Sequence, residues 1–168
     1  DTPIPEPGSV GPAVGAAMTG LRPVVELMYV DFVGLVMDQL ANQAAKIRYM
    51  FGGQIGVPMV LRSQGGTGRS AAAQHSQALG GWVAHVPGLR VAMPATMNDA
   101  YHLLRHPLTL PDPVVFLEHK SLYTQKGMLD VEKPDAPWGK ALVRQSGNDV
   151  TIVAYSRMVM EALNAADS

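Results

Sequence analysis

The sequence predicts an α/β fold in which a parallel sheet is flanked by helices on both faces. Short apolar runs that suit buried strands alternate along the chain with segments whose apolar residues recur every three or four positions. The strand-like runs are continuously apolar, as is typical of strands covered on both sides. Hydrophobic residues make up 47% of the 168 residues and charged residues 16%, which fits a globular protein with a real core.

The first third of the chain predicts one short helix, one strand and one long helix. Residues 1–9 hold three prolines, so we expect an extended or turn-like segment with Glu6 outside any helix interior. Small residues over 10–20 predict a short, closely packed helix with a glycine stop. The apolar run 22–30 predicts the first strand, and the periodic pattern over 31–50 predicts the longest helix.

The middle of the chain continues this alternation. Residues 57–63 predict the second strand, and a helix is expected to run through 74–86 until a Pro-Gly pair stops it. Residues 89–95 predict the third strand. A helix over 98–106, capped by the threonine or asparagine that precedes or opens it, leads to the fourth strand at 113–119.

The C-terminal part predicts a connector and the beginning of a second domain. Residues 120–139 show little periodicity, whereas 149–156 reads as a new strand and 157–168 as the start of a new helix. We therefore expect one domain over 1–138 and the beginning of another over 139–168.

Composition excludes several classes of function. A net charge of −1 provides no basic surface for nucleic acid. The absence of cysteine excludes disulfides, thiolate metal sites and cysteine nucleophiles. No apolar run reaches the roughly 18 residues that cross a bilayer, so we expect no membrane partner and a soluble, intracellular protein.

The run from Arg62 to Gln77, RSQGGTGRSAAAQHSQ, is the part of the chain that a hydrophobic core explains least. Its three glycines permit either a turn with positive φ or close approach of the backbone to another group. A phosphate-binding loop is not supported, because the required lysine is missing after Gly68.

Candidate functional residues lie after the predicted strands, because sites in parallel sheets form at the carboxyl ends of strands. Together with one carboxylate in the proline-rich N-terminus, the candidates are Glu6, Asp31, Phe32, His75, Glu118, His119 and Lys120. An ordinary structural role remains open for each of them: a turn carboxylate for Glu6, core packing for Phe32 and a hydrogen-bonded loop residue for His75. The pattern alone predicts no reaction.

Four runs resemble the β subunit of thiamin diphosphate-dependent 2-oxoacid dehydrogenases, most closely the pyruvate or acetoin type. They are DTPIPEPGSVGPAVGAAMTGLRPVVELM, AAAQHSQ, PGLRVAMPAT and DPVVFLEHKSLY. The resemblance implies a thiamin diphosphate-binding fold, with a transketolase-like pyrimidine-binding domain over residues 1–138. Residues 139–168 would begin the transketolase C-terminal-like domain.

The resemblance also implies roles for three residues. Glu6 matches the glutamate that hydrogen-bonds N1′ of the aminopyrimidine and favours the imino form, whose nitrogen removes the proton from the thiazolium C2. Phe32 matches the aromatic residue that stacks on the aminopyrimidine. His75 matches a histidine near the substrate, where it orients or protonates substrate and assists acyl transfer.

A monovalent cation, K⁺, is a further implication of the resemblance. It would be held through main-chain carbonyls at the matching positions Met59, Pro107, Leu108, Leu110 and Asp112.

As the resemblance implies, the reaction is oxidative decarboxylation of a 2-oxoacid, or cleavage of acetoin, with acyl transfer to lipoamide. The family's GDG motif for Mg²⁺ and the diphosphate is absent here and belongs to an α subunit, so an α2β2 heterotetramer is expected. A lipoyl acyltransferase core is a further expected partner. The expected location is the bacterial cytoplasm, with the mitochondrial matrix as second choice.

One departure from the family leaves an alternative open. The usual ISEMGF run is IPEPGS here, so prolines flank Glu6 on both sides. A non-catalytic relative that keeps the fold but does not activate thiamin is therefore the second hypothesis.

Overall fold

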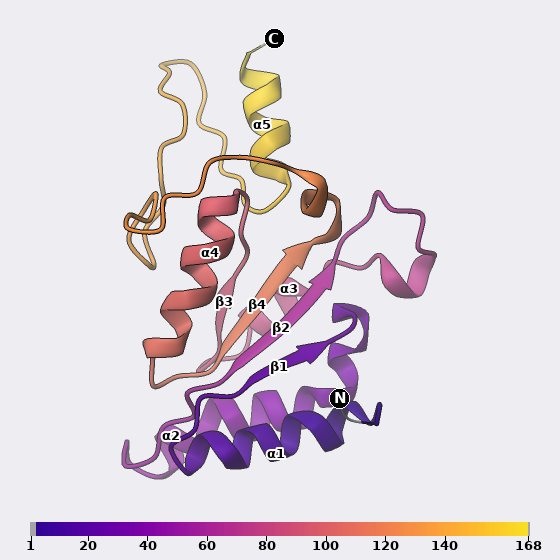
Figure 1. The fold of residues 1–168 in the computed structure, drawn as a ribbon, viewed down its shortest axis with the longest axis vertical. Helices are drawn as coiled ribbons and strands as arrows, with labels where there is room; N and C mark the ends of the chain where they lie inside the picture. The colour runs from indigo at the N-terminus through magenta and orange to yellow at the C-terminus, as the bar shows by residue number, and fades with distance from the viewer. Residues whose placement is uncertain (1–2, 168) are drawn as a thin grey trace.

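The computed structural model describes residues 3–167, which form a four-stranded parallel sheet between helices (Figure 1). The strands are β1 (Val24–Leu27), β2 (Val60–Gly65), β3 (Arg90–Ala92) and β4 (Val114–His119). Their order is β1-β2-β4-β3, and every neighbouring pair is parallel. The predicted parallel sheet is confirmed, although each strand except β2 lies within a longer predicted run.

Five α-helices accompany the sheet: α1 (Glu6–Met18), α2 (Ala45–Met50), α3 (Gly80–Ala84), α4 (Met97–Arg105) and α5 (Met158–Ala166). Residues 3–167 also form five helical segments of 3₁₀ or π type: η1 (Val30–Val36), η2 (Asp38–Ala44), η3 (Ala73–His75), η4 (His106–Thr109) and η5 (Lys120–Thr124). Among residues 3–167 no helix is both long and apolar enough to cross a bilayer.

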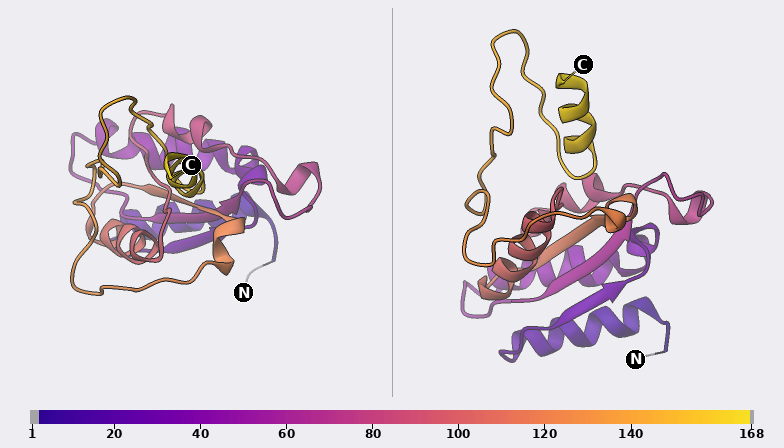
Figure 2. Two further views of the ribbon diagram at one scale, coloured as in Figure 1. Left: turned by 90° about the horizontal axis from the view of Figure 1, so that it is seen from above. Right: turned by 45° about the horizontal axis from the view of Figure 1, so that its top comes forward.

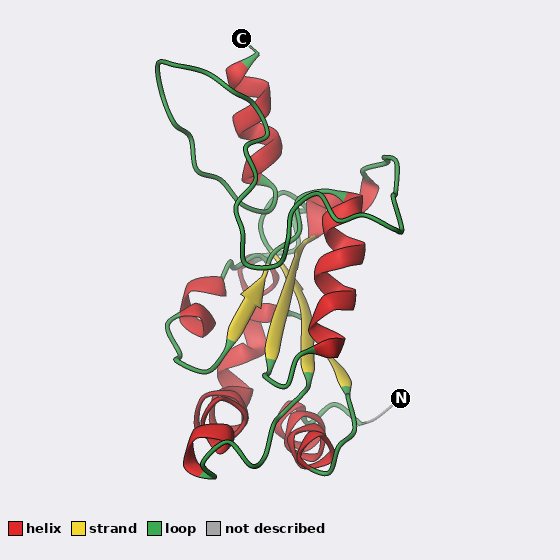
Figure 3. Cartoon of the chain, turned by 90° about the vertical axis from the view of Figure 1, so that its left-hand side faces the viewer, coloured by secondary structure: helices red, strands yellow, loops and turns green. Residues whose placement is uncertain are grey.

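Helices lie on both faces of the sheet (Figure 3), and an apolar cluster packs against each face. On β4, Val115 and Leu117 pack into the larger cluster with α1, η1 and η2, whereas Val114 and Phe116 pack with α4 and η4 on the opposite face. Successive strand residues point to opposite faces, so a continuous apolar run is what two covered faces require. The prediction of helices on both faces is confirmed.

The helix α1 begins at Glu6, four residues earlier than the sequence analysis predicted. Pro7 does not prevent this, because the first turn of a helix has no internal acceptor for its N–H groups and proline fits there. The expectation that the chain stays non-helical up to residue 9 is therefore wrong from Glu6 onward. The first two residues of that expectation lie outside the described part of the chain.

The long helix predicted over 31–50 is divided into η1, η2 and α2. Of the apolar residues that this pattern places on one face, Val36, Leu40, Ala44 and Ile47 are buried and Phe32 is half-buried, but Leu35 and Met50 are 54% and 61% exposed. The buried residues keep their packing although the backbone tightens into 3₁₀ turns in η1 and widens into π turns in η2. Valine and glycine have a weak preference for regular helix, so tertiary contacts decide the backbone geometry here.

The helix predicted over 74–86 is wrong for its first half. Only η3 and the five-residue α3 are helical, and residues 76–79 form a loop. The reason lies in the hydrogen bonds of Gln77: its N–H donates to Asp31 and its carbonyl accepts from Gly66. These partners satisfy the backbone without a helix.

The capped helix near residue 98 is confirmed as α4. Thr96 accepts a hydrogen bond from the N–H of Asp99 at 3.0 Å, and the Asp99 carboxylate accepts from the N–H of Thr96 at 3.2 Å. This reciprocal capping box satisfies two N-terminal donors and fixes where the helix begins.

The C-terminal segment has its predicted helix, α5, but not its predicted strand. Residues 149–156 form no strand and have none beside them among residues 3–167, and residues 149–153 are exposed. A strand needs a hydrogen-bonding neighbour, so its residue pattern alone does not produce one. Figure 2 shows this loop and α5 standing apart from the sheet.

Candidate functional site

The candidate site lies at the edge of the sheet where β1, β2 and β4 end (Figure 1). The register pairs Leu27 with Ser63 and Gly65 with His119, so the segments that follow these strands leave the sheet side by side. The helix α1 runs opposite to the strands, which brings its first residue, Glu6, to the same edge. Four of the seven sequence candidates follow these strand ends, namely Asp31, Phe32, His75 and Lys120, and a fifth, His119, is the last residue of β4.

Phe32 and His75, separated by more than forty residues in sequence, are in direct contact. Their ring centroids lie 5.8 Å apart in an edge-on arrangement, and the Tyr29 ring contacts His75 in the same way at 5.0 Å. All three side chains are half-buried. A partly open aromatic wall beside an imidazole is suited to a flat heterocyclic ligand.

Glu6 stands at the start of α1 with its side chain half-buried. Within residues 3–167 its carboxylate makes no hydrogen bond or ion pair. The structure therefore brings Glu6 to the right edge of the sheet without joining it to Phe32 or His75, and the carboxylate remains able to accept a hydrogen bond from a ligand.

Two charged side chains contact the backbone next to His75. The ammonium group of Lys120 donates to the carbonyl of His75 and lies 4.8 Å from the centre of the Tyr29 ring. Two residues further along the chain, the N–H of Gln77 donates to Asp31 Oδ1 at 3.1 Å. These contacts come from the ends of β4 and β1.

The glycines at the end of β2 are explained by contacts within the chain. A Cβ on Gly65 would lie 2.5 Å from Val30, and one on Gly66, whose φ is +85°, would lie 2.3 Å from the His119 ring. Any larger residue at either position would clash with a neighbour, so the loop depends on glycine for close approach.

His119 is a half-buried neighbour of this loop. Its Nδ1 lies 2.7 Å from Ser121 Oγ. Burial, together with the positive charges of Arg157 and Lys120, lowers the pKa of His119 below its ordinary value, so the imidazole is neutral at neutral pH.

Glu118 has a structural role that the sequence analysis left open. It pairs with Arg62 Nε at 2.6 Å, and Arg62 also pairs with Glu26 at 2.6 Å, so one guanidinium links three adjacent strands. Tyr123 donates to Glu118, and burial with the nearby carboxylate raises the pKa of Tyr123 to about 12. Glu118 is thus committed to neighbours within the chain.

The carbonyls predicted to hold a monovalent cation lie at the opposite edge, before β2 and β4. One nitrogen of Arg22, Nη1, donates to the carbonyls of Leu108 at 2.8 Å and Leu110 at 2.9 Å. The Met59 carbonyl accepts from Val114 N–H and the Pro107 carbonyl from Leu110 N–H. Two of the five predicted carbonyls therefore converge on one positively charged point.

Asp112, the fifth predicted cation ligand, is bound to two arginines. Burial favours its neutral form, but hydrogen bonds from Arg48 and Arg90 outweigh it and lower the pKa of Asp112. Its carboxylate stays ionised at the surface between these two partners.

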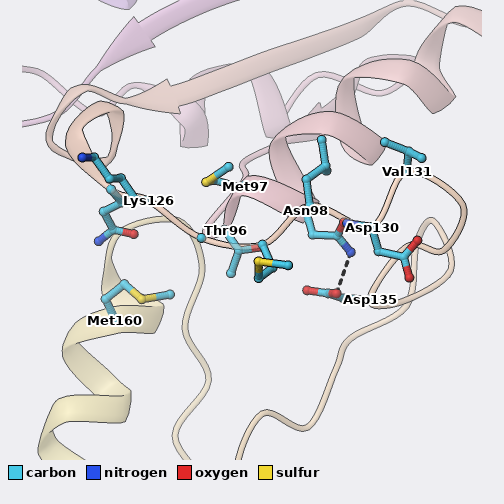
Figure 4. A pocket seen from close by; sticks show the side chains of 12 residues that line it. Thr96, Met97, Asn98, Lys126, Asp130, Val131, Asp135 and Met160 are labelled. Atoms are coloured by element: carbon cyan, nitrogen blue, oxygen red, sulfur yellow. Dashed lines mark hydrogen bonds between the residues drawn. The ribbon is translucent and has the colours of Figure 1, made fainter.

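A separate cavity of about 650 Å³ lies away from this cluster (Figure 4). It is bounded by the N-terminus of α4, the connector around residues 125–131 and Met160 of α5. Asn98 and Asp135 close one side through a 2.7 Å hydrogen bond. None of the predicted catalytic or cofactor-binding residues lines it.

Three contributing residues were not among the sequence candidates. Tyr29 lies two residues after the end of β1, and that position was the available signal. Arg22 reaches a carbonyl 86 residues away, and Arg157 approaches Gly68, at 2.7 Å from a Cβ built there. Local sequence patterns do not predict contacts between residues so far apart in the chain.

Comparison with known proteins agrees with this arrangement. The β subunit of acetoin:2,6-dichlorophenolindophenol oxidoreductase from Cupriavidus necator is 48% identical over 166 residues, covering 99% of this chain and 49% of that protein. The mitochondrial pyruvate dehydrogenase E1 component subunit beta-2 of Oryza sativa subsp. japonica is 50% identical over 171 residues, covering 99% and 46%. The chain thus spans about half the length of the curated relatives it matches.

A solved structure of a split-gene transketolase, an inactive β4 tetramer, shares the fold. Its TM-score is 0.75 at 22% identity, with 98% of this chain and 50% of that chain covered. At the level of domains, residues 139–168 match the transketolase C-terminal domain and residues 1–126 match the transketolase pyrimidine-binding domain. The chain therefore belongs to the transketolase pyrimidine-binding domain family.

Proposed function

We propose that this chain is part of the β subunit of a thiamin diphosphate-dependent E1 component that acts on a 2-oxoacid of the pyruvate type or on acetoin. The observation that carries the proposal is the contact of His75 with Phe32 at the sheet edge that Glu6 also reaches. Identity of 48% to an acetoin-oxidising β subunit and 50% to a pyruvate dehydrogenase β subunit supports this choice of reaction.

The residues at this edge fit the aminopyrimidine end of thiamin diphosphate. Phe32 offers a half-buried aromatic ring, and Glu6 offers a carboxylate with no partner within residues 3–167. When bound, the cofactor supplies a carbon acid whose deprotonated form attacks the substrate carbonyl. The role of Glu6 is to accept the hydrogen bond at N1′, and the role of Phe32 is to hold the ring in plane by stacking.

His75 is assigned to the substrate. Its imidazole is half-buried between two aromatic rings, so one part faces the protein and another faces open space. In this position it can orient a carbonyl substrate, hold a proton for it and assist acyl transfer to a lipoyl group.

The complete site requires partners. An α subunit would supply Mg²⁺ and the groups that hold the diphosphate, in an α2β2 heterotetramer, and a lipoyl acyltransferase core would accept the acyl group. Among residues 3–167 no cluster of three or more acidic or histidine side chains could hold a metal ion. A cytoplasmic location, or the mitochondrial matrix as second choice, stays a prediction.

We also retain the prediction of K⁺ at the main-chain carbonyls. The convergence of the Leu108 and Leu110 carbonyls on Arg22 Nη1 marks a point that favours positive charge. Since Arg22 already supplies a charge there, K⁺ would share or compete for these oxygens.

The substitution Glu6→Gln tests the cofactor role. In the complete α/β assembly, hydrogen–deuterium exchange at C2 of the bound thiamin should slow by about a hundredfold or more, because an amide cannot share the N1′ proton as a carboxylate does. The exchange is measured by quenched NMR, with Glu132→Gln at an exposed position as control. An unchanged rate in Glu6→Gln would remove Glu6 from the site.

His75→Ala tests the substrate role. Reductive acylation of lipoamide should fall by about a hundredfold, as for loss of a positioned acid or base, while C2 exchange stays unchanged. His85→Ala, at an exposed site after α3, is the matched control. If the acylation rate is the same in both variants, His75 only organises its loop.

Replacement of tetramethylammonium by K⁺ at constant ionic strength tests the cation prediction. Bound K⁺ should raise the midpoint of thermal unfolding by mass action, and the rise should be larger in Arg22→Met, where two carbonyls lose their donor. Equal midpoints in the two salts, for both proteins, would exclude a K⁺ site.

A further inference from the structure

We propose that Lys120 and Asp31 are positioning residues that clamp the backbone at the carbonyl of His75 and two residues after it, at Gln77, and thereby fix the His75 imidazole. The proposal rests on the function proposed above for His75. A buried cation from the end of β4 holds the carbonyl of His75, and an anion from the end of β1 holds the N–H of Gln77.

The segment that carries His75 needs such a clamp. Gly66 and Gly68 have positive φ, and so do Ser70 and Ala72, while residues 67–70 are exposed. A chain of this kind has many accessible conformations and contributes few apolar contacts, so its order must come from specific polar contacts.

Lys120 is 6% exposed, which is unusual for a lysine. Within residues 3–167 it forms no ion pair with a carboxylate, so its charge is stabilised by the His75 carbonyl and the face of Tyr29. Displacing the His75 carbonyl would leave a buried charge short of a partner, and this penalty holds the loop in place.

Reciprocal contacts strengthen the attachment of the loop to β4. Arg69, from the exposed part of the loop, donates to the carbonyl of Lys120 at 3.4 Å. Lys120 therefore contacts the loop twice: its ammonium group donates to the His75 carbonyl, and its own carbonyl accepts from Arg69.

Asp31 holds the backbone of the loop at Gln77, two residues after His75. Its Oδ1 accepts the N–H of Gln77 at 3.1 Å, and the carbonyl of Gln77 accepts the N–H of Gly66 at 2.8 Å, so both polar groups of residue 77 are fixed. Asp31 Oδ2 is buried with no partner within residues 3–167. One carboxylate oxygen thus serves the loop, while the other remains available to a donor outside these residues.

The clamp sets the geometry of the candidate site because Asp31 lies beside Phe32 in sequence. The same segment supplies the two rings that contact His75, at 5.0 and 5.8 Å. Lys120 and Asp31 hold the backbone from the His75 carbonyl to Gln77, and the His75 N–H donates to the Ala72 carbonyl at 3.4 Å. The two rings further restrict the side-chain torsions of His75.

Amide hydrogen exchange tests the clamp without using catalysis. In the full-length chain assembled with its α subunit, Lys120→Met should accelerate exchange across residues 72–77 by about tenfold or more, the effect of losing a hydrogen bond to a charged group. Lys46→Met is the matched control, since Lys46 also donates to a main-chain carbonyl, that of Pro87, far from this loop. Exchange equal to wild type in Lys120→Met would overturn the proposal.

Kinetics separate positioning from general stability. Lys120→Met should lower kcat for reductive acylation by about a hundredfold, as misplacement of a catalytic group can, with little change in KM. Added to His75→Ala it should cost nothing more, because Lys120 acts through His75. An equal further loss in the double variant would assign Lys120 a separate role and contradict the clamp.

A second variant covers the case in which Lys120→Met does not fold. Tyr29→Leu keeps an apolar side chain but removes the ring that contacts both Lys120 and His75. It should accelerate exchange at residues 72–77 in the same way, and unchanged exchange there would overturn the proposal. If the wild-type assembly shows no reductive acylation, the proposed function fails, and the exchange result still decides the clamp.

Discussion

The parallel pairing of β2 with both β1 and β4 is the constraint on which the rest of the structure depends. Parallel strands finish at the same edge, and the register sets Gly65 beside His119 and Ser63 beside Leu27. Three segments distant in sequence therefore emerge as neighbours. Buried Ser63 adds to this pairing, since its hydroxyl donates to the Leu27 carbonyl at 2.6 Å. Without this alignment Phe32, His75 and Lys120 would not be brought into contact.

Charged groups in this chain divide into those that hold the sheet and those that hold the site. Arg62 joins Glu26 and Glu118 across three strands, and Asp112 joins two arginines at the opposite edge. These pairs are partly exposed, so each contributes only modestly to stability. Lys120 and Asp31 differ because they contact backbone amides of one loop rather than one another. Their effect is on the position of His75 more than on the total free energy of unfolding.

Local sequence predicted the features that depend on local chemistry. The four strands, the Thr96 capping box of α4 and the helix α5 all follow from apolar runs or cap residues. The start of α1 at Glu6 was missed because proline in a first turn was treated as a break. The loop at residues 76–79 was missed because its hydrogen bonds come from Asp31 and Gly66. For the site, Glu6, Phe32 and His75 were candidates by position and received their roles from a family resemblance. The contacts of Tyr29, Lys120 and Arg22 arise only from tertiary packing.

We propose that this chain carries one half of a cofactor site: Glu6 and Phe32 would bind the pyrimidine end of thiamin diphosphate, and another chain would bind the diphosphate end. The most direct measurement is calorimetric titration of thiamin diphosphate with Mg²⁺ into the full-length chain, the α subunit and their assembly. Tight binding is expected for the assembly alone. Binding of equal affinity to the isolated full-length chain would contradict it.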